Sequence, residues 1–455
     1  MRRAGAVLDT IGNTPLLEVR RLDTGPCRLL LKLESQNPTG SIKDRIGLSM
    51  VEAAEREGRL QPGATLIEAT AGNTGLGLAL VAAQKGYRLI LVIPDKMAQE
   101  KILHLRALGA DCRITRSDVG KGHPEYYQDV AERLAAEIPG SFYVNQFANP
   151  ANPLAHETTT GPEIWAQTAG AVDAVVCGVG SGGTLTGLSR YFARIAPQVE
   201  MVLADPTGSV LVDVVRTGAI QNEAGSWLVE GIGEDFIPKN CDLSRVRIAY
   251  SIPDRDSFLA ARELLHEEGI LGGSSTGTLL AAALRYCREQ TTAKTVVTFV
   301  CDSGNKYLSK MYNDHWLFEQ GLLERPAENS LVDLIVRRYA EGSTVTVRPQ
   351  DSLLHAYRRM KLAEVSQLPV MEDERLVGIL DETDLIQHVH LDPARFKDRV
   401  ETAMVTQLTT VGPDSAIEDL MPVFARGHVA IVADRGRFIG LITRIDLLNY
   451  LRKQL

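Results

Sequence analysis

The chain has 455 residues, too many for one compact core, so it predicts two or three domains. Hydrophobic residues make up 44% and charged residues 23%, as in an ordinary globular protein, and the net charge of −8 argues against a nucleic-acid partner. No run of 18 apolar residues occurs, so we expect no segment that crosses a membrane.

The N-terminus and the cysteines favour a cytoplasmic protein. The apolar stretch within the first nine residues is too short for a signal peptide. None of the six cysteines forms a CxxC pair, so neither a zinc site nor a disulfide framework is indicated. We therefore expect reduced thiols and no metal. The cysteines are Cys27, Cys112, Cys177, Cys241, Cys287 and Cys301.

Apolar strands and helical patterns alternate between about residues 29 and 302. We expect strands at 29–34, 65–69, 88–94, 174–179, 201–204 and 295–301, and helices at 74–85, 97–108, 184–195 and 279–288. Nearly continuous apolar strands separated by helices are typical of a mostly parallel sheet covered on both faces. The ligands of such α/β sheets bind at the carboxyl ends of the strands, so the chemistry is expected in the strand-to-helix loops.

Lys43 follows one of these strands and a turn. Ser41 and Asp44 have the spacing of a capping box, which places Lys43 in the first turn of a helix whose apolar face begins at Ile42. The positive end of the helix dipole disfavours a cation and favours the neutral amine that a Schiff-base lysine must become. The alternative is a solvated lysine on an amphipathic helix.

Two glycine-bearing loops each open a helix. Thr70-Ala71-Gly72-Asn73-Thr74-Gly75 points backbone N–H groups at a possible anion site, or is a tight turn without a ligand. Gly180-Ser181-Gly182-Gly183-Thr184 has the composition of a phosphate cradle. It matches neither GxxxxGK[ST] nor GxGxxG, so it favours a monophosphate over a nucleoside triphosphate or a dinucleotide.

Three further segments carry polar or glycine-rich patterns. Residues 272–277 form another loop before a helix, and residues 230–236 are rich in glycine. Polar side chains follow the expected strand at 142–144, and His156 there is a candidate base. A helix start after Asn152-Pro153 explains that segment equally well, and we prefer it.

One lysine, one monophosphate loop and several hydroxyl-bearing loops suggest a cofactor such as pyridoxal 5'-phosphate. Five segments, 37–45, 70–75, 180–184, 230–238 and 272–277, occur in the order found in the fold type II (β) family of pyridoxal-phosphate enzymes. Within it, the chain resembles the group of cystathionine β-synthases and O-acetylserine sulfhydrylases from about residue 7 to 318, including an opening match at 11–16. The resemblance implies an α/β core like that of the tryptophan synthase β-subunit.

The resemblance also implies the cofactor contacts. Lys43 would form an imine with the cofactor, and Asn73 would hydrogen-bond its 3'-oxygen. Ser274 would face the pyridine nitrogen and leave it neutral, which suits β-elimination better than transamination. The phosphate would be held by Gly180, Ser181, Gly182, Gly183 and Thr184.

The implied substrate contacts include two departures from the family pattern. The substrate carboxylate would bind Thr70, Ala71, Thr74 and Gln146, and Gly231, Gly233 and Glu234 would lie near the substrate entrance. Glu234 and Phe147 stand where the eukaryotic enzymes usually have tyrosines. Only ten residues precede Ile11, so we expect no haem-binding extension and no haem.

The resemblance implies a lyase that replaces the hydroxyl of L-serine by the thiol of L-homocysteine and releases L-cystathionine, a transsulfuration step of cysteine biosynthesis. The nearest alternative is a cysteine synthase that uses O-acetylserine and sulfide. An alternative of another class is a sensor of adenosyl ligands that has the fold without the catalysis.

The C-terminal part contains an internal repeat. Residues 378–385 return as 440–447, 62 positions later, and residues 347–352 return as 411–415. The pair resembles the tandem CBS domains of a Bateman module. We expect a catalytic domain at 1–320, a linker at 321–342 and the module at 343–455, with repeats at about 343–392 and 398–455.

In that family a Thr-x-x-Asp element contacts the ribose of an adenosyl ligand. The second repeat has Thr443 and Asp446, whereas the first has Asp381 in place of the threonine, followed by Asp384. An adenosyl effector is therefore expected at the second copy first, and the alternative is a module that only dimerises. The resemblance implies a homodimer or a higher homo-oligomer.

Overall fold

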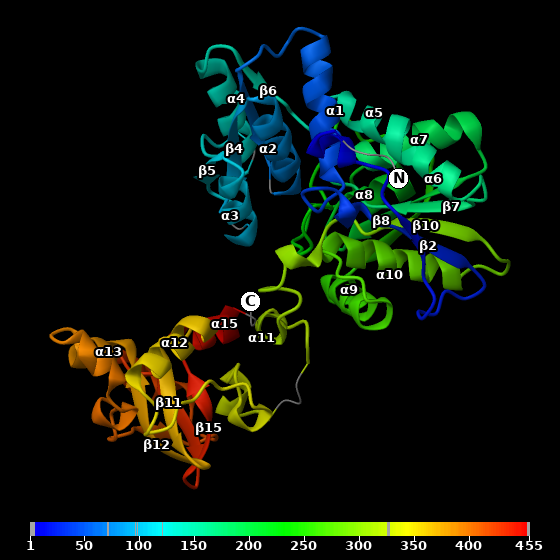
Figure 1. Ribbon diagram of the computed structural model, residues 1–455. Helices are drawn as coiled ribbons and strands as arrows, with labels where there is room; N and C mark the ends of the chain where they lie inside the picture. Colours follow the sequence, from blue (N-terminus) through cyan, green and yellow to red (C-terminus); the bar gives the residue numbers. More distant parts are fainter. Residues whose placement is uncertain are drawn as a thin grey trace. The chain divides into compact units, whose positions relative to one another are not determined.

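The structure is a computed structural model that describes residues 5–70, 72–95, 97, 99–120, 122–324 and 328–452 (Figure 1). The chain folds into two compact units, one extending to Tyr312 and one beginning at Asn313. Within the described ranges, no helix has both the length and the apolar character needed to cross a bilayer.

The N-terminal unit contains two sheets, not the single sheet predicted. The six-stranded sheet has the order β1 (Leu16–Glu18), β2 (Arg28–Lys32), β10 (Thr295–Phe299), β7 (Ala174–Cys177), β8 (Glu200–Pro206) and β9 (Val246–Ile252), and only β1 runs antiparallel. The four-stranded sheet is parallel, in the order β5 (Asp111–Thr115), β4 (Arg88–Pro94), β3 (Thr65–Ala69) and β6 (Ser141–Tyr143). Uniformly apolar strands do not specify their neighbours, so the division was not visible in the sequence.

Ten α-helices of the N-terminal unit are described, and they include the four predicted from their ranges, the one predicted to begin near Lys43 and the one predicted near Asn152. They are α1 (Lys43–Arg56), α2 (Asn73–Lys85), α3 (Gln99–Ala107), α4 (Tyr127–Glu137), α5 (Ala151–Ala155), α6 (Gly161–Gln167), α7 (Gly183–Ile195), α8 (Leu211–Thr217), α9 (Asp254–Glu268) and α10 (Ser274–Arg288). The helix expected from residue 279 begins at Ser274, at the loop itself. We call the four-stranded sheet with α2, α3 and α4 the smaller half, and the six-stranded sheet with α6 to α10 the larger half.

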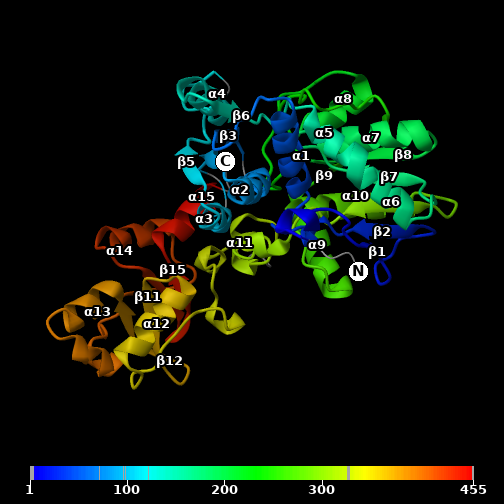
Figure 2. The ribbon, with the colours of Figure 1, turned by 45° about the horizontal axis from the view of Figure 1, so that its top comes forward.

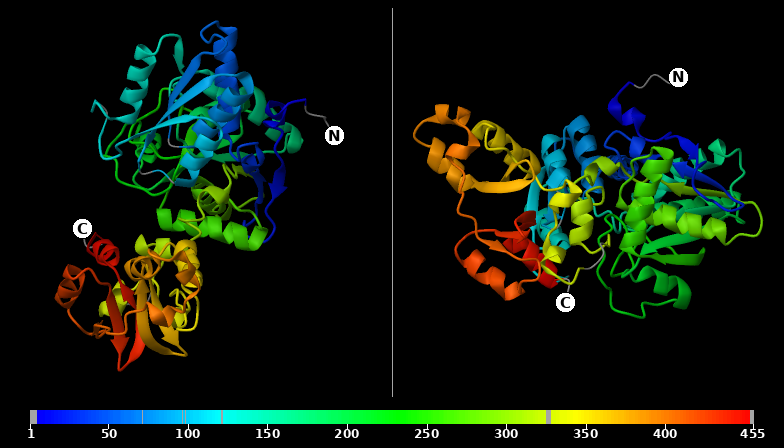
Figure 3. Two further views of the ribbon diagram at one scale, coloured as in Figure 1. Left: turned by 60° about the vertical axis from the view of Figure 1, so that its left-hand side comes forward. Right: turned by 90° about the horizontal axis from the view of Figure 1, so that it is seen from below.

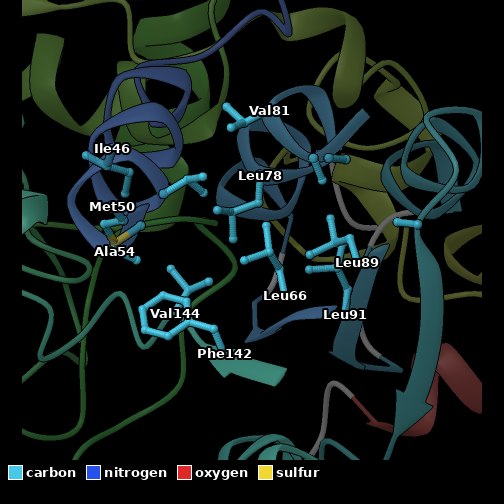
Figure 4. Close-up of a cluster of buried hydrophobic side chains, with 14 of the residues drawn as sticks. Ile46, Met50, Ala54, Leu66, Leu78, Val81, Leu89, Leu91, Phe142 and Val144 are labelled. Atoms are coloured by element: carbon cyan, nitrogen blue, oxygen red, sulfur yellow. The ribbon is translucent and has the colours of Figure 1, made fainter. Parts of the chain in front are cut away.

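Helix α1 contacts α2 of the smaller half and α5, which in turn packs against α7 of the larger half (Figure 2). The α1–α2 crossing is close because both helices have glycine there. A Cβ atom on Gly77 would lie 2.7 Å from the carbonyl oxygen of Lys43, and one on Gly47 would lie 2.9 Å from the backbone of Gly77. Buried side chains of α1, α2 and the smaller sheet, among them Met50 and Leu78, fill the space beneath (Figure 4). The packing fixes where α1 begins, and Lys43 is its first residue.

The C-terminal unit repeats one pattern of helix, hairpin and helix (Figure 3). After α11 (Asp314–Glu319), the first copy contains α12 (Leu353–Ala363), β11 (Gln367–Glu372), β12 (Arg375–Asp381) and α13 (Glu382–Val389). The second contains β13 (Thr410–Val411), α14 (Met421–Ala425), β14 (Ala430–Asp434), β15 (Arg437–Ile442) and α15 (Arg444–Arg452). Each hairpin has an irregularity, between Val370 and Met371 and between Val432 and Ala433, so the repeat of 62 positions extends to this detail.

The segment before the first repeat packs into the second one. Leu331, Leu334 and Ile335 are buried in a cluster with Leu420 and Phe424 of the second copy. Part of the stretch expected as a linker therefore belongs to the core of this unit. The domain boundaries themselves stay a prediction.

Candidate active site

Helix α1 begins at Lys43, as predicted, but without the predicted capping box. Residues 40–42 run beside 301–303, and Ser41 pairs with Asp302 as a short antiparallel bridge. Asp44 accepts hydrogen bonds from the backbone N–H (2.7 Å) and the hydroxyl of Thr39 instead. The capping expectation failed because a neighbouring segment, distant in sequence, holds Ser41 in an extended conformation.

The Lys43 amine lies half-buried among groups of opposite charge. No hydrogen bond or ion pair of its Nζ is found within the described residues. Desolvation lowers the pKa of Lys43, while the nearby Cys301, Asp302 and Glu234 oppose that shift. An unpaired amine with a lowered pKa is the form of lysine that acts as a nucleophile or a base.

The loop Gly180–Thr184 joins β7 to α7 in very little space. A Cβ atom on Gly183 would lie 1.8 Å from Asn152 Oδ1, and one on Gly180 would lie 2.5 Å from the carbonyl oxygen of Gly231. Asn152 Nδ2 donates to Ser181 Oγ (2.8 Å), yet the buried Asn152 Oδ1 has no partner in the described structure. Backbone N–H groups at the start of α7 and the hydroxyls of Ser181 and Thr184 are donors that suit a bound phosphate monoester, whereas the Asn152 oxygen is an acceptor that a phosphate oxygen cannot satisfy.

His156 supports this loop. Its ring is buried, with Nε2 3.2 Å from Thr184 Oγ1 and Nδ1 3.0 Å from Thr160 Oγ1. Burial, followed by the charges of Arg45 and Lys43, lowers the pKa of His156 well below its usual value, so the ring is neutral. It lies in a π-helical turn directly after α5, in agreement with the helical interpretation of this segment.

Asn73 is the first residue of α2, and its amide is held from both sides. Its Nδ2 donates to Asp302 Oδ2 (2.7 Å), and its Oδ1 accepts from Lys306 Nζ (2.8 Å). The Tyr307 hydroxyl also donates to Asp302 Oδ2 (2.7 Å), whereas the buried Asp302 Oδ1 has no partner in the described structure. The Asn73 amide group therefore has a defined orientation, with its NH₂ toward Asp302.

Ser274 lies at the start of α10 and keeps a proton to donate. Its Oγ accepts a hydrogen bond from the backbone N–H of Glu230 (3.0 Å) and lies beside the Tyr307 hydroxyl. The Ser274 hydroxyl donates a long hydrogen bond to the Glu230 carbonyl oxygen (3.5 Å), and its proton can turn from there toward Tyr307 or toward an acceptor on a ligand. An unprotonated ring nitrogen is such an acceptor.

The residues expected to bind the substrate carboxylate come together beside β3. Thr74 Oγ1 donates to Gln146 Oε1 (2.6 Å), and Thr70 Oγ1 accepts from the backbone N–H of Gly72 (3.3 Å). Glu68 lies beneath them, and burial raises its pKa to about 8 despite hydrogen bonds from the backbone of Gln146. Ala71, the remaining residue of this group, lies outside the described residues.

The segment Gly231–Glu234 lies against the phosphate loop. Gly231 and Gly233 have φ values of 89° and 88°, and the Gly233 N–H donates to the Val179 carbonyl (2.8 Å). Glu234 is close enough to Lys43 to affect its pKa. Phe147 packs against Phe236, with ring centroids 5.7 Å apart.

In the repeats, the predicted ribose-binding side chains are engaged in helix caps. Asp446 Oδ2 accepts from the backbone N–H (2.7 Å) and the hydroxyl (2.6 Å) of Thr443. Asp381 and Asp384 form a reciprocal capping box, with distances of 3.0 Å and 2.8 Å. Both elements thus have a structural role at the start of a helix.

Sequence reasoning missed several side chains of the site. Asn152 was interpreted only as part of a helix start, and the groups around Asn73 and Ser274 were not considered. The overlooked residues are Asp302, Lys306, Tyr307, Lys101 and Glu230. One signal was available, because the polar run from Asp302 to Lys306 follows β10 as the other candidate loops follow their strands. Within the described residues, no group of three or more metal-ligating side chains is found.

Comparisons with known proteins agree with this geometry. Residues 7–302 match the family of pyridoxal-phosphate-dependent enzymes, and residues 336–391 and 400–453 match the CBS domain. The chain is 35% identical to a cystathionine β-synthase of Dictyostelium discoideum, over 98% of this chain and 92% of that protein. It is 43% identical to cysteine synthase A of Escherichia coli strain K12, over 66% of this chain and 92% of that protein.

A solved structure, a hydrogen sulfide-producing enzyme of Fusobacterium nucleatum, is 38% identical with a TM-score of 0.63, covering 67% of this chain and 100% of that chain. The chain therefore belongs to the pyridoxal-phosphate-dependent enzymes, and its C-terminal unit contains two CBS domains. Within that family it is a homologue of cystathionine β-synthase along nearly its whole length. The site fits the cofactor, since the glycine-rich loop at the start of α7 leaves no room for a Cβ atom on Gly182 or Gly183 and the Lys43 amine is unpaired within the described residues.

Proposed function

We propose that the N-terminal unit replaces the hydroxyl of L-serine by the thiol of L-homocysteine, which gives L-cystathionine and water. The observation that carries the proposal is the Lys43 amine, which has a lowered pKa and no partner within the described residues. Similarity to cystathionine β-synthases over 98% of the chain supports the choice of substrates.

The cofactor, when bound, supplies an electrophilic carbon for amines and an electron sink for the substrate α-carbon. In our proposal, Lys43 holds it, and residues Gly180–Thr184 bind its phosphate. Asn73 would donate a hydrogen bond to the 3'-oxygen of the cofactor, and Ser274 would donate one to its ring nitrogen. Asn152 and His156 support the phosphate loop through Ser181 and Thr184.

Lys43 also moves the protons in this proposal. Once the serine amino group has taken its place on the cofactor, the neutral Lys43 amine removes the α-proton of serine as a general base. Lys43 returns that proton to the departing hydroxyl, which leaves as water. Neutral Lys43 then accepts the proton of the homocysteine thiol as the sulfur bonds to the β-carbon, and it passes this proton to the α-carbon. The amine must therefore switch between two protonation states, which the lowered pKa of Lys43 favours.

Thr70, Ala71, Thr74 and Gln146 would orient the serine carboxylate, with the Thr74–Gln146 hydrogen bond fixing two of these side chains. The carboxylate of Glu234, near the entrance with Gly231 and Gly233, would attract the ammonium group of homocysteine. Opposite charges favour encounter and orientation more than tight binding.

A cysteine synthase that uses O-acetylserine and sulfide is the second candidate, because the chain is 43% identical to cysteine synthase A of Escherichia coli. Assaying the purified protein side by side with both substrate pairs separates the two. We expect a higher kcat/KM with serine and homocysteine. A clear preference for O-acetylserine and sulfide would replace the first proposal with the second. A visible cofactor absorbance that does not respond to serine would favour the non-catalytic sensor.

For the CBS domains we propose an adenosyl effector that binds at Thr443 and Asp446, with Asp381 and Asp384 as the weaker second site. S-adenosylmethionine is the first compound to try, followed by AMP and ATP. The effector would shift an equilibrium between two conformations of the enzyme. A homodimer or higher homo-oligomer in the cytoplasm completes the proposal, and the six free cysteines are compatible with that compartment.

A further inference from the structure

A buried ion pair joins the two halves of the N-terminal unit. Lys101 lies on α3 of the smaller half and is only 3% exposed. Its Nζ lies 2.5 Å from Glu230 Oε2 and 3.1 Å from the Tyr307 hydroxyl, and 4.5 Å from the centre of the Tyr307 ring. Both partners belong to the larger half. Burying a charge is costly without such partners, so the pair holds α3 against the opposite half.

Glu230 carries a second cation on its other oxygen, because Lys310 Nζ lies 2.8 Å from Glu230 Oε1. Although burial raises the pKa of Glu230, Lys101 and Lys310 together lower it below its usual value. Glu230 is therefore ionised at neutral pH. When Lys101 is replaced, Glu230 keeps its ion pair with Lys310.

The Lys101 side chain covers the loop that we assign to the substrate carboxylate. A Cβ atom on Gly72 would lie 2.8 Å from Lys101 Cδ and 3.5 Å from Lys101 Nζ. Thr70 and Asn73 flank Gly72 in this loop. The position of the loop therefore depends on where Lys101 is held.

The same network reaches the ring-facing residues of the proposed cofactor site. The Glu230 backbone N–H donates to Ser274 Oγ (3.0 Å). Tyr307, the other partner of Lys101, donates to Asp302, which accepts from Asn73. A displacement at the carboxylate loop is thus connected by direct contacts to Ser274 and to Asn73.

We propose that Lys101 and Glu230 form a clasp that positions Thr70 and Gly72–Thr74 of the carboxylate loop across the cofactor site, and that they act as positioning residues for the amino-acid substrate. This inference rests on the proposed function for its substrate, but the contact itself is independent of which amino acid is used. Without the clasp, the smaller half keeps its own core and its contacts through Asn73, but α3 loses its tie to the larger half.

The test compares Lys101→Met, Glu230→Gln and the double variant with the wild type, each reconstituted with pyridoxal phosphate. The change in cofactor absorbance on titration with L-serine gives the Kd. We expect both single variants to raise that Kd about tenfold, as the loss of one buried charged contact implies. The double variant is expected to raise it by less than the product of the two single effects, because both changes break the Lys101–Glu230 contact, while Glu230→Gln also weakens the contact with Lys310. Lys85→Met is the matched control, since it removes an ion pair of α2 with Glu55 of α1, away from the clasp.

Amide hydrogen exchange of residues 99–107 provides a readout that requires no turnover. We expect faster exchange in Lys101→Met and unchanged exchange in Lys85→Met, with both variants folded by thermal unfolding. Unchanged exchange in Lys101→Met, or additive effects on the serine Kd, overturns the clasp. If Lys101→Met does not fold, Lys101→Gln takes its place. If the cofactor absorbance of the wild type does not change on addition of serine, the proposed function is contradicted. The hydrogen-exchange rates of residues 99–107 then test the clasp by themselves.

Discussion

The polar side chains of the proposed cofactor site and those of the CBS domains differ in whether their oxygens have hydrogen-bond partners. In the first, buried oxygens of Asn152, Asp302 and Glu68 have no partner in the described structure. In the second, Asp446 and Asp384 accept hydrogen bonds from their own helix starts. An unsatisfied buried polar atom costs about 1–3 kcal/mol, and these three oxygens could be satisfied by groups of a ligand that donate hydrogen bonds. The Asp446 and Asp384 carboxylates already have partners, so an adenosyl ligand would have to compete with the caps.

Replacing Lys43 with alanine should produce the largest effect on the catalytic side of this comparison. We expect turnover of serine and homocysteine to fall at least about a thousandfold, since the general base is lost. Rates measured with matched cofactor occupancy test this. Activity close to that of the wild type would exclude Lys43 from the chemistry.

Asn152→Ala tests whether Asn152 supports the phosphate loop through Ser181. The variant loses the hydrogen bond to Ser181 Oγ and leaves that hydroxyl without its amide partner. We expect the Kd for pyridoxal phosphate to rise about tenfold, corresponding to about 1.4 kcal/mol. Asn222→Ala, at an exposed asparagine that contacts Asp213, is the control. Equal cofactor affinity in both variants would mean that Asn152 only fills space.

The buried carboxyl of Glu68, in the proposed cofactor site, should make the unfolding free energy depend on pH. Burial raises its pKa from 4.5 to about 8, so between these values the folded protein retains a proton that the unfolded chain has lost. The unfolding free energy of the wild type should therefore fall, relative to that of Glu68→Gln, as the pH rises from about 5 to about 8, by at most about 1.4 kcal/mol per pH unit. Urea unfolding of both proteins across this range measures the difference. A constant difference would show that Glu68 is ionised in the fold.

The caps of the CBS domains give the smallest expected change. Asp446→Ala and Asp384→Ala should each lower the stability of the C-terminal unit by about 1 kcal/mol, because each removes a helix cap. Calorimetric titration with S-adenosylmethionine, AMP and ATP then asks whether the wild type binds and Asp446→Ala does not. If the variants lose stability but the wild type gives no binding heat with any of these compounds, the module has a structural role only.

The sequence predicted well what depends on local pattern. The strands at 65–69 and 88–94, the helix start at Lys43 and the repeat of 62 positions are all as expected. What it did not predict depends on contacts between distant segments. The bridge between Ser41 and Asp302 replaced a capping box, and the strands divided into two sheets. Charge pairs such as Lys101 with Glu230 have no spacing signal, because only the fold brings them together.

The most direct test of the account is to find which lysine carries the cofactor. Borohydride reduction of the protein reconstituted with pyridoxal phosphate makes the imine bond permanent, and peptide mass spectrometry then locates the label. Lys101 and Lys306 lie in the same region and serve as internal controls. The account predicts label on Lys43 alone. Label on Lys101 or Lys306, with Lys43 unmodified, would contradict it.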